Sequence, residues 1–351
     1  METIQQKIRL TQYSHGAGCG CKIAPTILDV ILKDNETKEH YPNLLVGNSS
    51  RDDAAVYDLG NGMALISTTD FFMPIVDDPF QFGRIAATNA ISDVYAMGGT
   101  PTLAIAILGW PIDKLAPEIA RQVVAGGRRA CLDAGIPLAG GHSIDCPEPV
   151  FGLAVNGLIE TKNIKQNNTA KEGDLLFLTK NIGVGIISTA SKKGLVKEED
   201  LQRAIDSMTT LNKVGVALGK LKGVNALTDV TGFGLAGHLI EMAEGSGLTA
   251  HINISKIQLL ENIETYLLQN CVPGGTKRNW KSYGHKLSAI SERSINILCD
   301  PQTSGGLLVA LNADAMDEFQ SIMASHNLSL LTKQPIGKLT KKETVSVIVE
   351  E

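Results

Sequence analysis

Short apolar strand patterns alternate with helical patterns along this 351-residue chain, and a polar stretch interrupts the alternation near the middle. That stretch, residues 161–173 (TKNIKQNNTAKEG), has no hydrophobic periodicity and is typical of a connection between domains. A chain of this length is expected to form about two domains, at roughly 150 residues each. We therefore predict two domains of the α/β or α+β class, with the boundary in this stretch.

The first half is predicted to begin its sheet with a hairpin. Residues 54–59 and 63–69 are strand-like, and Gly60-Asn61-Gly62 joins them as a turn. Residues 80–97 are small and apolar, and Gly98-Gly99 closes this helical pattern. The other predicted strands are 102–108, 136–140, 150–159, 174–179, 224–229, 248–254, 306–311 and two near the C-terminus, and the other predicted helices are 25–32, 117–134, 183–193, 198–221, 235–245, 260–269 and 313–325.

Composition argues against several classes of function. The net charge is −5, the pI is about 5.9 and no block of basic residues occurs, so nucleic acid is not an expected partner. No apolar run reaches the length of a membrane span, and the start, METIQQKIRL, lacks the apolar stretch of a secretory signal. Six scattered cysteines without such a signal indicate free thiols, and we expect a cytoplasmic protein with no membrane partner.

Two cysteines near the N-terminus lie among three glycines, in the segment HGAGCGCK at 15–22. Glycine adopts backbone conformations that other residues avoid, so we expect a pliable loop that can carry a sulfur towards a substrate. Lys22 is expected to favour the thiolate, which is the nucleophilic form. A disordered tail and half of a zinc site are the alternatives, but Cys19 and Cys21 are closer in sequence than the usual zinc-binding spacing.

Aspartates recur where predicted strands or helices meet loops. Asp93 follows Asn89 by one helical turn, so the two side chains share a face. For any one of these aspartates alone, a role as a helix cap or a turn residue is the better explanation. Together, however, carboxylates on rigid element ends suit Mg²⁺ ions that bridge a polyphosphate and neutralise charge during phosphoryl transfer. The aspartates are Asp52, Asp53, Asp70, Asp93 and Asp229.

Glycine-rich loops are predicted after two strands, where backbone amides can approach phosphate closely. One is the loop at 140–143, and the other carries a G-x-G-x-x-G pattern at 232–237. There is no G-x-x-x-x-G-K-[ST] match. A dinucleotide site also needs an acidic residue after the next strand, and residues 252–255 (INIS) provide none. We therefore reject NAD and retain phosphate with Mg²⁺, and we assign no acid or base role to the histidines.

Seven segments together resemble the selenophosphate synthetase family, also called selenide, water dikinase. They match in order, and the resemblance runs from about residue 8 to the last predicted strands. The segments are HGAGCGCK (15–22), RDDAAV (51–56), STTDFF (67–72), FGRIAATNAISDVYAMGG (82–99), AGGHSID (139–145), LTDVTGFGL (227–235) and CDPQTSGG (299–306).

The resemblance implies a reaction and a set of site residues. ATP, selenide and water would give selenophosphate, AMP and orthophosphate, with more than one Mg²⁺ ion as the cofactor. Cys19 matches the family's reactive position, which is selenocysteine in some members, and Lys22 matches a catalytic lysine that contacts phosphate. The residues implied to bind ATP are Lys22, Ser50, Arg51, Asp52, Asp70, Asp93, Gly141, His142 and Ser143, and those implied to bind metal are Asp53, Asp93 and Asp229.

The resemblance also implies an architecture. The family shares a two-domain α/β fold with aminoimidazole ribonucleotide synthetase and is typically homodimeric, with ATP near the interface. We thus expect a flexible loop at 1–22, an ATP-binding and dimerisation domain at 23–160 and a C-terminal α/β domain at 174–351. A selenium-delivery protein would be a further partner.

Two other interpretations stay open. The chain could be another ATP-dependent enzyme of the same fold group, such as a purine-pathway synthetase or a thiamine phosphate kinase, although neither needs the segment at 15–22. It could instead be an inactive paralogue or a carrier of selenium or metal. The carboxylates and Lys22 count against a carrier, and an ATP turnover assay separates these cases.

Overall fold

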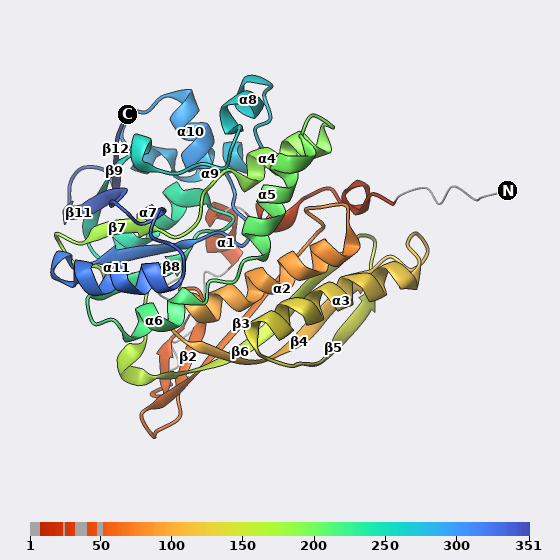
Figure 1. Cartoon of the computed structure of the whole chain (residues 1–351), viewed down its shortest axis with the longest axis horizontal. Helices are drawn as coiled ribbons and strands as arrows, with labels where there is room; N and C mark the ends of the chain where they lie inside the picture. Colours follow the sequence, from red (N-terminus) through yellow and green to blue (C-terminus); the bar gives the residue numbers. More distant parts are fainter. Residues whose placement is uncertain (1–7, 24, 32–40, 48–51) are drawn as a thin grey trace.

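The chain folds around two six-stranded sheets, each of which carries helices (Figure 1). This computed structural model describes residues 8–23, 25–31, 41–47 and 52–351. The sheet of the first half has the order β1-β2-β3-β6-β4-β5, and that of the second half has the order β12-β9-β11-β7-β10-β8. The chain thus has the predicted class, α/β with two sheets.

In the first sheet, β3 and β6 form the longest ladder, which runs antiparallel from Met63 opposite Glu160 to Phe72 opposite Phe151. The prediction of a loop at 140–143 is wrong, because these residues belong to β5 and pair in parallel with β4. A Cβ atom on Gly141 would lie 2.3 Å from the Ala106 carbonyl oxygen. Glycine here marks the close approach of two strands, which sequence reasoning mistook for a loop. The strands of this half are β1 (Leu44–Val46), β2 (Ala55–Asp58), β3 (Met63–Phe72), β4 (Thr100–Trp110), β5 (Leu138–Asp145) and β6 (Val150–Glu160), and its helices are α1 (Pro25–Ile31), α2 (Pro79–Ala96) and α3 (Pro117–Ala134).

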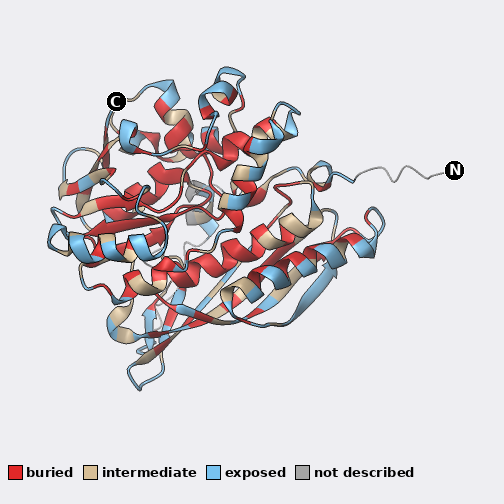
Figure 2. Cartoon of the chain, in the orientation of Figure 1, coloured by how far each residue is buried: buried red, intermediate tan, exposed pale blue. Residues whose placement is uncertain are grey.

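Helix α2 lies in the middle of the molecule, between the first sheet and the second half. Asp78 caps its start by accepting a hydrogen bond of 2.7 Å from the Gln81 amide, and Pro79 occupies the first turn. Small side chains let α2 approach α3 closely, since a Cβ on Gly83 would lie 1.8 Å from the Val123 carbonyl oxygen. Figure 2 shows that α2 is buried along most of its length, whereas α3 exposes one face. Polar residues on α2 are therefore held rigidly between the two halves.

The second half contains more, shorter helices than predicted. The expected helix at 198–221 is two helices, α5 and α6, because the chain between them is anchored to other elements. Asn212 in this break donates to the Ser92 hydroxyl at 2.8 Å and to the Gly305 carbonyl at 2.9 Å. The strands are β7 (Leu175–Leu178), β8 (Val224–Asp229), β9 (Leu248–Asn253), β10 (Leu307–Leu311), β11 (Gly337–Lys341) and β12 (Val347–Glu350), and the helices are α4 (Val184–Lys192), α5 (Glu198–Thr209), α6 (Val214–Lys220), α7 (Gly234–Gly245), α8 (Ile263–Leu268), α9 (Gly274–Tyr283), α10 (Glu292–Leu298) and α11 (Met316–Ser325). Sequence reasoning missed β1, α9 and α10.

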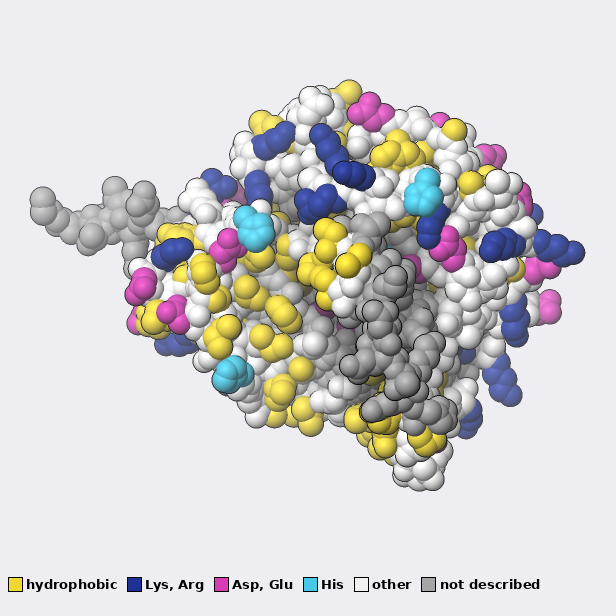
Figure 3. All heavy atoms as spheres, turned by 180° about the vertical axis from the view of Figure 1, so that it is seen from behind, with side chains coloured by type: hydrophobic (Ala, Val, Ile, Leu, Met, Phe, Trp, Pro, Cys, Tyr) yellow, Lys and Arg dark blue, Asp and Glu magenta, His cyan; other side chains and the backbone are white. Residues whose placement is uncertain are grey.

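The face of the first sheet that points away from α2 and α3 is apolar and exposed. Phe71 is 53% exposed, Ile105 42% and Ile144 58%. Figure 3 shows hydrophobic side chains gathered on this side of the molecule. An exposed apolar face of this kind marks an interaction surface. Within the described part of the chain, no helix is both long and apolar enough to cross a membrane.

Candidate active site

A cavity of about 680 Å³ opens where β2 and β3 of the first sheet meet β8 and the glycine loop of the second half. It is called the acidic cleft below, because most of its charged lining residues are carboxylates. Lys22 also lines it. The carboxylates are Asp52, Asp53, Asp70, Asp93, Asp229 and Glu241.

Three of these aspartates form a tight cluster. Asp53 precedes β2, Asp93 projects from the buried helix α2, and Asp229 ends β8, yet one carboxylate oxygen of each lies within 4.8 Å of the others. The Thr68 hydroxyl donates to Asp93 at 2.5 Å and the Thr228 hydroxyl to Asp53 at 2.9 Å. Oδ2 of Asp53 and Oδ2 of Asp229 are buried and have no hydrogen-bond partner among the residues the structure describes. Oxygen atoms left unpaired in this way fit a bound divalent cation.

The electrostatics of the cluster lead to the same conclusion. Burial raises the pKa of Asp53 well above its ordinary value, and the nearby Asp229 raises it further. Burial likewise raises the pKa of Asp93 well above its ordinary value, and it raises the pKa of Asp229 to about 6. Three buried carboxylates repel one another, so a cation that holds them ionised stabilises the cluster. The donor set of three carboxylate oxygens suits Mg²⁺.

Lys22 supplies positive charge at the edge of this cluster. Its ammonium nitrogen lies 4.0 Å from Oδ1 of Asp70 and 6.0 Å from the centre of the Phe233 ring. The Asp70 carboxylate raises the pKa of Lys22, so the lysine is fully protonated. A fixed cation beside a carboxylate cluster is the arrangement expected for binding the phosphates of a nucleotide–metal complex.

Cys19 occupies a different environment from the one its sequence predicts. Residues Gly18–Cys21 form a short 3₁₀ turn, and Cys19 is only 1% exposed, with its Sγ 3.2 Å from Oδ1 of Asn89. Lys22 lowers the pKa of the Cys19 thiol, as expected, but in the structure described this does not produce a thiolate. Burial raises the pKa of Cys19 well above its ordinary value and outweighs the opposite effect of Lys22. The thiol is therefore neutral here.

Asn89 joins the thiol to the rest of the site, and sequence reasoning assigned it no role. Its Oδ1 accepts from the Cys19 thiol and, at 2.7 Å, from the Ser304 amide, while its Nδ2 donates to Asp70 at 2.6 Å. Thr303 completes the arrangement, since its hydroxyl accepts from the Cys19 amide at 3.0 Å. The signals available in the sequence were the helical spacing of Asn89 and Asp93 and the motif at 299–306.

Comparisons with known proteins agree on the family. Residues 51–159 match the N-terminal domain of AIR synthase related proteins, and residues 171–350 match the C-terminal domain. A selenide, water dikinase of Aeromonas hydrophila is 62% identical over 332 residues, which cover 95% of each chain. The chain belongs to the selenide, water dikinase family. Another member, from Pseudomonas putida, is 58% identical over 99% of this chain and 100% of its own.

Solved structures show the same fold outside the selenide, water dikinase family. The hydrogenase maturation protein HypE, in a crystal structure of its complex with ATP, superposes with a TM-score of 0.63. It is 19% identical in sequence and covers 88% of this chain and 87% of its own. At this identity the likeness supports the predicted two-domain fold.

The structure brings together most of the positions implied by the selenide, water dikinase resemblance. Lys22, the carboxylates and the segment that carries Cys19 meet at the acidic cleft. Gly141, His142 and Ser143 do not, because they lie on β5, at the edge of the sheet farthest from β1, and none of them lines the cleft. Ser50 and Arg51 lie outside the described residues.

The glycine loop after β8 packs against the segment that carries Cys19. A Cβ on Gly232 would lie 2.4 Å from the Cys19 carbonyl oxygen, so glycine is needed for this contact. His238, on the helix that follows, accepts a hydrogen bond of 3.1 Å from the Thr231 amide through Nε2. Burial lowers the pKa of His238 to about 3, so it serves as a neutral acceptor that fixes the loop.

Proposed function

We propose that this chain makes selenophosphate from ATP, selenide and water and releases AMP and orthophosphate. The observation that carries the proposal is the meeting, at one cleft, of three clustered carboxylates, two of which keep an unpaired buried oxygen, with a fully protonated lysine and the segment that bears Cys19. Relatives at 56–62% identity over nearly the whole chain bear the name selenide, water dikinase. The structural neighbour with bound ATP supports a nucleotide in the cleft.

In this proposal Asp53, Asp93 and Asp229 hold Mg²⁺. When bound, Mg²⁺ would neutralise the negative charge of the phosphates. Lys22 binds a phosphate oxygen and reaches the cleft from the same segment as Cys19, so nucleotide binding and the position of the thiol are coupled. Asn89 holds the thiol and Asp70 in fixed relation, and burial of the thiol keeps water away from it.

We further propose a homodimer formed through the exposed apolar face of the first sheet. His142 and Ile144 pair with Ile107 and Gly109 of β4 and lie on this face, so a second copy packed there would cover them. In such a dimer Gly141–Ser143 would lie at or beside the interface. A dimer thus accounts for positions that a single chain leaves outside its own cleft.

The dimer can be tested with one substitution on that face. Ile105→Glu puts a charge on the centre of the apolar face, and light scattering after gel filtration should report a monomer. Leu268→Glu is the matched control, because Leu268 is 86% exposed on α8, far from this sheet, and the dimer should persist. A monomeric wild-type chain at micromolar concentration would contradict the proposal.

The reaction itself is tested by its products. Anaerobic incubation with ATP, Mg²⁺ and selenide should give AMP, orthophosphate and a phosphorus–selenium compound in equal amounts by phosphorus NMR. Accumulation of ADP as the final nucleotide would indicate a different enzyme of the same fold group. Full ATP turnover without a phosphorus–selenium signal would also contradict the proposal.

The free cysteines and the selenide substrate also bear on the compartment and the partners of the proposed enzyme. All six cysteines are free, which suits the reducing cytoplasm, and we propose that the enzyme works there. Selenide is reactive and scarce, so a delivery protein would present it to the enzyme. No observation on the described residues favours nucleic acid or a membrane as a partner.

A further inference from the structure

A second cavity, of about 270 Å³, lies on the other side of the segment that carries Cys19. Gly16, Ala17 and Gly20 form one wall, and the other walls come from α4, α9 and the motif at 299–306. It is called the basic cavity below. It shares no lining residue with the acidic cleft, so residues 16–22 separate the two spaces.

The charges of the two spaces are opposite. The basic cavity is lined by His15, Lys192 and Arg278 and by no acidic residue. Lys192 donates to the Gly16 carbonyl at 2.9 Å and Arg278 to the Gly20 carbonyl at 2.7 Å. Neither cation forms an ion pair with a carboxylate in the described ranges, whereas His15 pairs with Glu148 at 3.0 Å. Lys192 and Arg278 are exposed, so the cavity is open to solvent.

Thr303 connects this cavity to the thiol segment. Its side chain lines the cavity, it is only 2% exposed, and its hydroxyl oxygen accepts from the Cys19 amide. The same hydroxyl also forms a side-chain hydrogen bond with the Cys19 thiol, which lowers the pKa of the thiol against the larger effect of burial. Thr303 therefore links the wall of the basic cavity directly to the amide and the sulfur of Cys19.

We propose that the basic cavity admits and holds the selenium substrate as the hydrogenselenide anion, which then reaches Cys19 from the side opposite ATP. This rests on the proposed function. Hydrogenselenide is the form of selenide present at neutral pH, and six carboxylates together with bound ATP would repel it from the acidic cleft. The positive charges of Lys192 and Arg278 in the basic cavity attract it.

The wall between the anion and the thiol is thin. It consists of backbone and three glycines, with Ala17 as the one further side chain on the cavity side of residues 16–20. A small shift of this segment would therefore bring selenium and sulfur together without moving a bulky side chain. Lys192 and Arg278 hold the two ends of this wall through its carbonyl oxygens.

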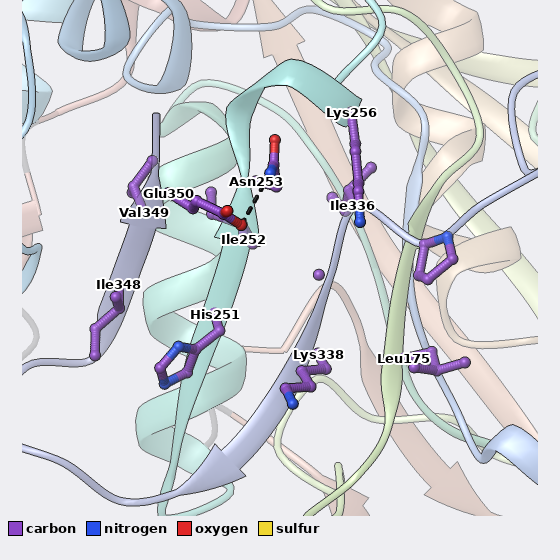
Figure 4. A pocket seen from close by; sticks show the side chains of 12 residues that line it. Leu175, His251, Ile252, Asn253, Lys256, Ile336, Lys338, Ile348, Val349 and Glu350 are labelled. Atoms are coloured by element: carbon purple, nitrogen blue, oxygen red, sulfur yellow. Dashed lines mark hydrogen bonds between the residues drawn. The ribbon is translucent and has the colours of Figure 1, made fainter.

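A third cavity offers a matched control. Figure 4 shows this space of about 340 Å³ on the second sheet, with Lys338 and His251 on neighbouring strands and Asn253 donating to Glu350. Its lining includes Lys338 and Lys256 but no residue of the segment 15–22. Removing a lysine there changes the net charge of the protein without touching the basic cavity.

The kinetic test compares Lys192→Gln/Arg278→Gln with Lys338→Gln under anaerobic conditions. In the double variant the KM for selenide should rise about tenfold, because two positive charges that attract the anion to the basic cavity are lost. The KM for ATP should stay within about twofold. The charge-restoring variant Lys192→Arg/Arg278→Lys should recover most of the loss, and Lys338→Gln should behave as wild type. An unchanged KM for selenide in the double variant, or a rise that affects ATP equally, would overturn the proposal.

A second measurement does not depend on turnover. Alkylation of Cys19 by anionic iodoacetate and by neutral iodoacetamide is followed by peptide mass spectrometry, with a non-hydrolysable ATP analogue and Mg²⁺ in the cleft. The ratio of the two rates should fall several-fold in the double variant and stay unchanged in Lys338→Gln. An equal ratio in wild type and double variant would refute a cationic access route. Absence of selenide-dependent AMP in the wild type would refute the proposed reaction alone, since the alkylation ratio tests the route independently.

Discussion

Replacing Asp229 with Asn should make the metal-free protein more stable at neutral pH, although it removes a residue of the candidate site. The side chain is 1% exposed, and burial together with its neighbours raises its pKa to about 6. A raised pKa in the folded state means that folding disfavours the ionised carboxylate. Asn keeps the size and the hydrogen-bonding ability of the side chain and removes the charge.

The magnitude follows from linkage between proton binding and folding. The difference between an ordinary value of 3.8 and a pKa of about 6 corresponds to about 3 kcal/mol, at roughly 1.4 kcal/mol for each pH unit. The folded state binds the proton more tightly, so ionisation of buried Asp229 lowers the free energy of unfolding. This loss of stability is absent below about pH 4 and complete above about pH 6. Allowing for imperfect amide contacts, we expect Asp229→Asn to gain about 1–3 kcal/mol at pH 7.5.

Urea unfolding in a chelator, without nucleotide, measures this gain at pH 7.5 and at pH 4.5. The gain should be present at pH 7.5 and should shrink at pH 4.5, where the wild-type carboxyl is largely protonated. Added Mg²⁺ should stabilise the wild type more than the variant, because binding to the folded state shifts the unfolding equilibrium. Asp113→Asn, at an exposed position, is the control and should change little at either pH.

The reasoning fails if the variant is equally stable or less stable than the wild type at pH 7.5 without metal. It also fails if the difference is the same at both pH values, since a titrating carboxyl cannot give a constant effect. Either result would mean that Asp229 is a structural turn residue whose contacts outweigh its charge.

Further expectations concern the cleft and the thiol. Cys19→Ser should abolish selenide-dependent turnover while ATP binding survives, and Cys21→Ser should matter less; normal selenophosphate output from Cys19→Ser would argue against a role for this sulfur. Asp53→Asn and Asp93→Asn should each raise the Mg²⁺ concentration needed for turnover or eliminate activity, as a magnesium titration of the rate would show. Because the pKa of Cys19 is raised, its alkylation by iodoacetamide should still be accelerating above pH 9, and a rate that levels off near pH 7 would indicate a thiolate. The N-terminal segment should become resistant to limited proteolysis when an ATP analogue and Mg²⁺ bind, and identical cleavage with and without them would count against closure.

The sequence was sufficient for the fold class and for most elements of the first half. Helix α2 was predicted at 80–97 and is observed at Pro79–Ala96, because a proline start and a glycine end are local signals. The domain boundary at 161–173 stays a prediction, based on a polar stretch without periodicity that contributes nothing to a core. Where tertiary contacts override local signals, as at the break after α5 and the glycines of β5, the prediction failed.

For the candidate site, too, some features follow from the sequence and others only from the tertiary structure. The types of residue at Cys19, Lys22 and the aspartates could be named from the sequence, because motifs record which chemistry is present. Their state could not, since the pKa of the Cys19 thiol depends on the burial produced by Asn89 and Thr303, which are distant in sequence. Burial and charge proximity are properties of the packed chain, and so the neutral thiol, the mutually repelling carboxylates and the basic cavity beside the Cys19 segment were decided by tertiary structure alone.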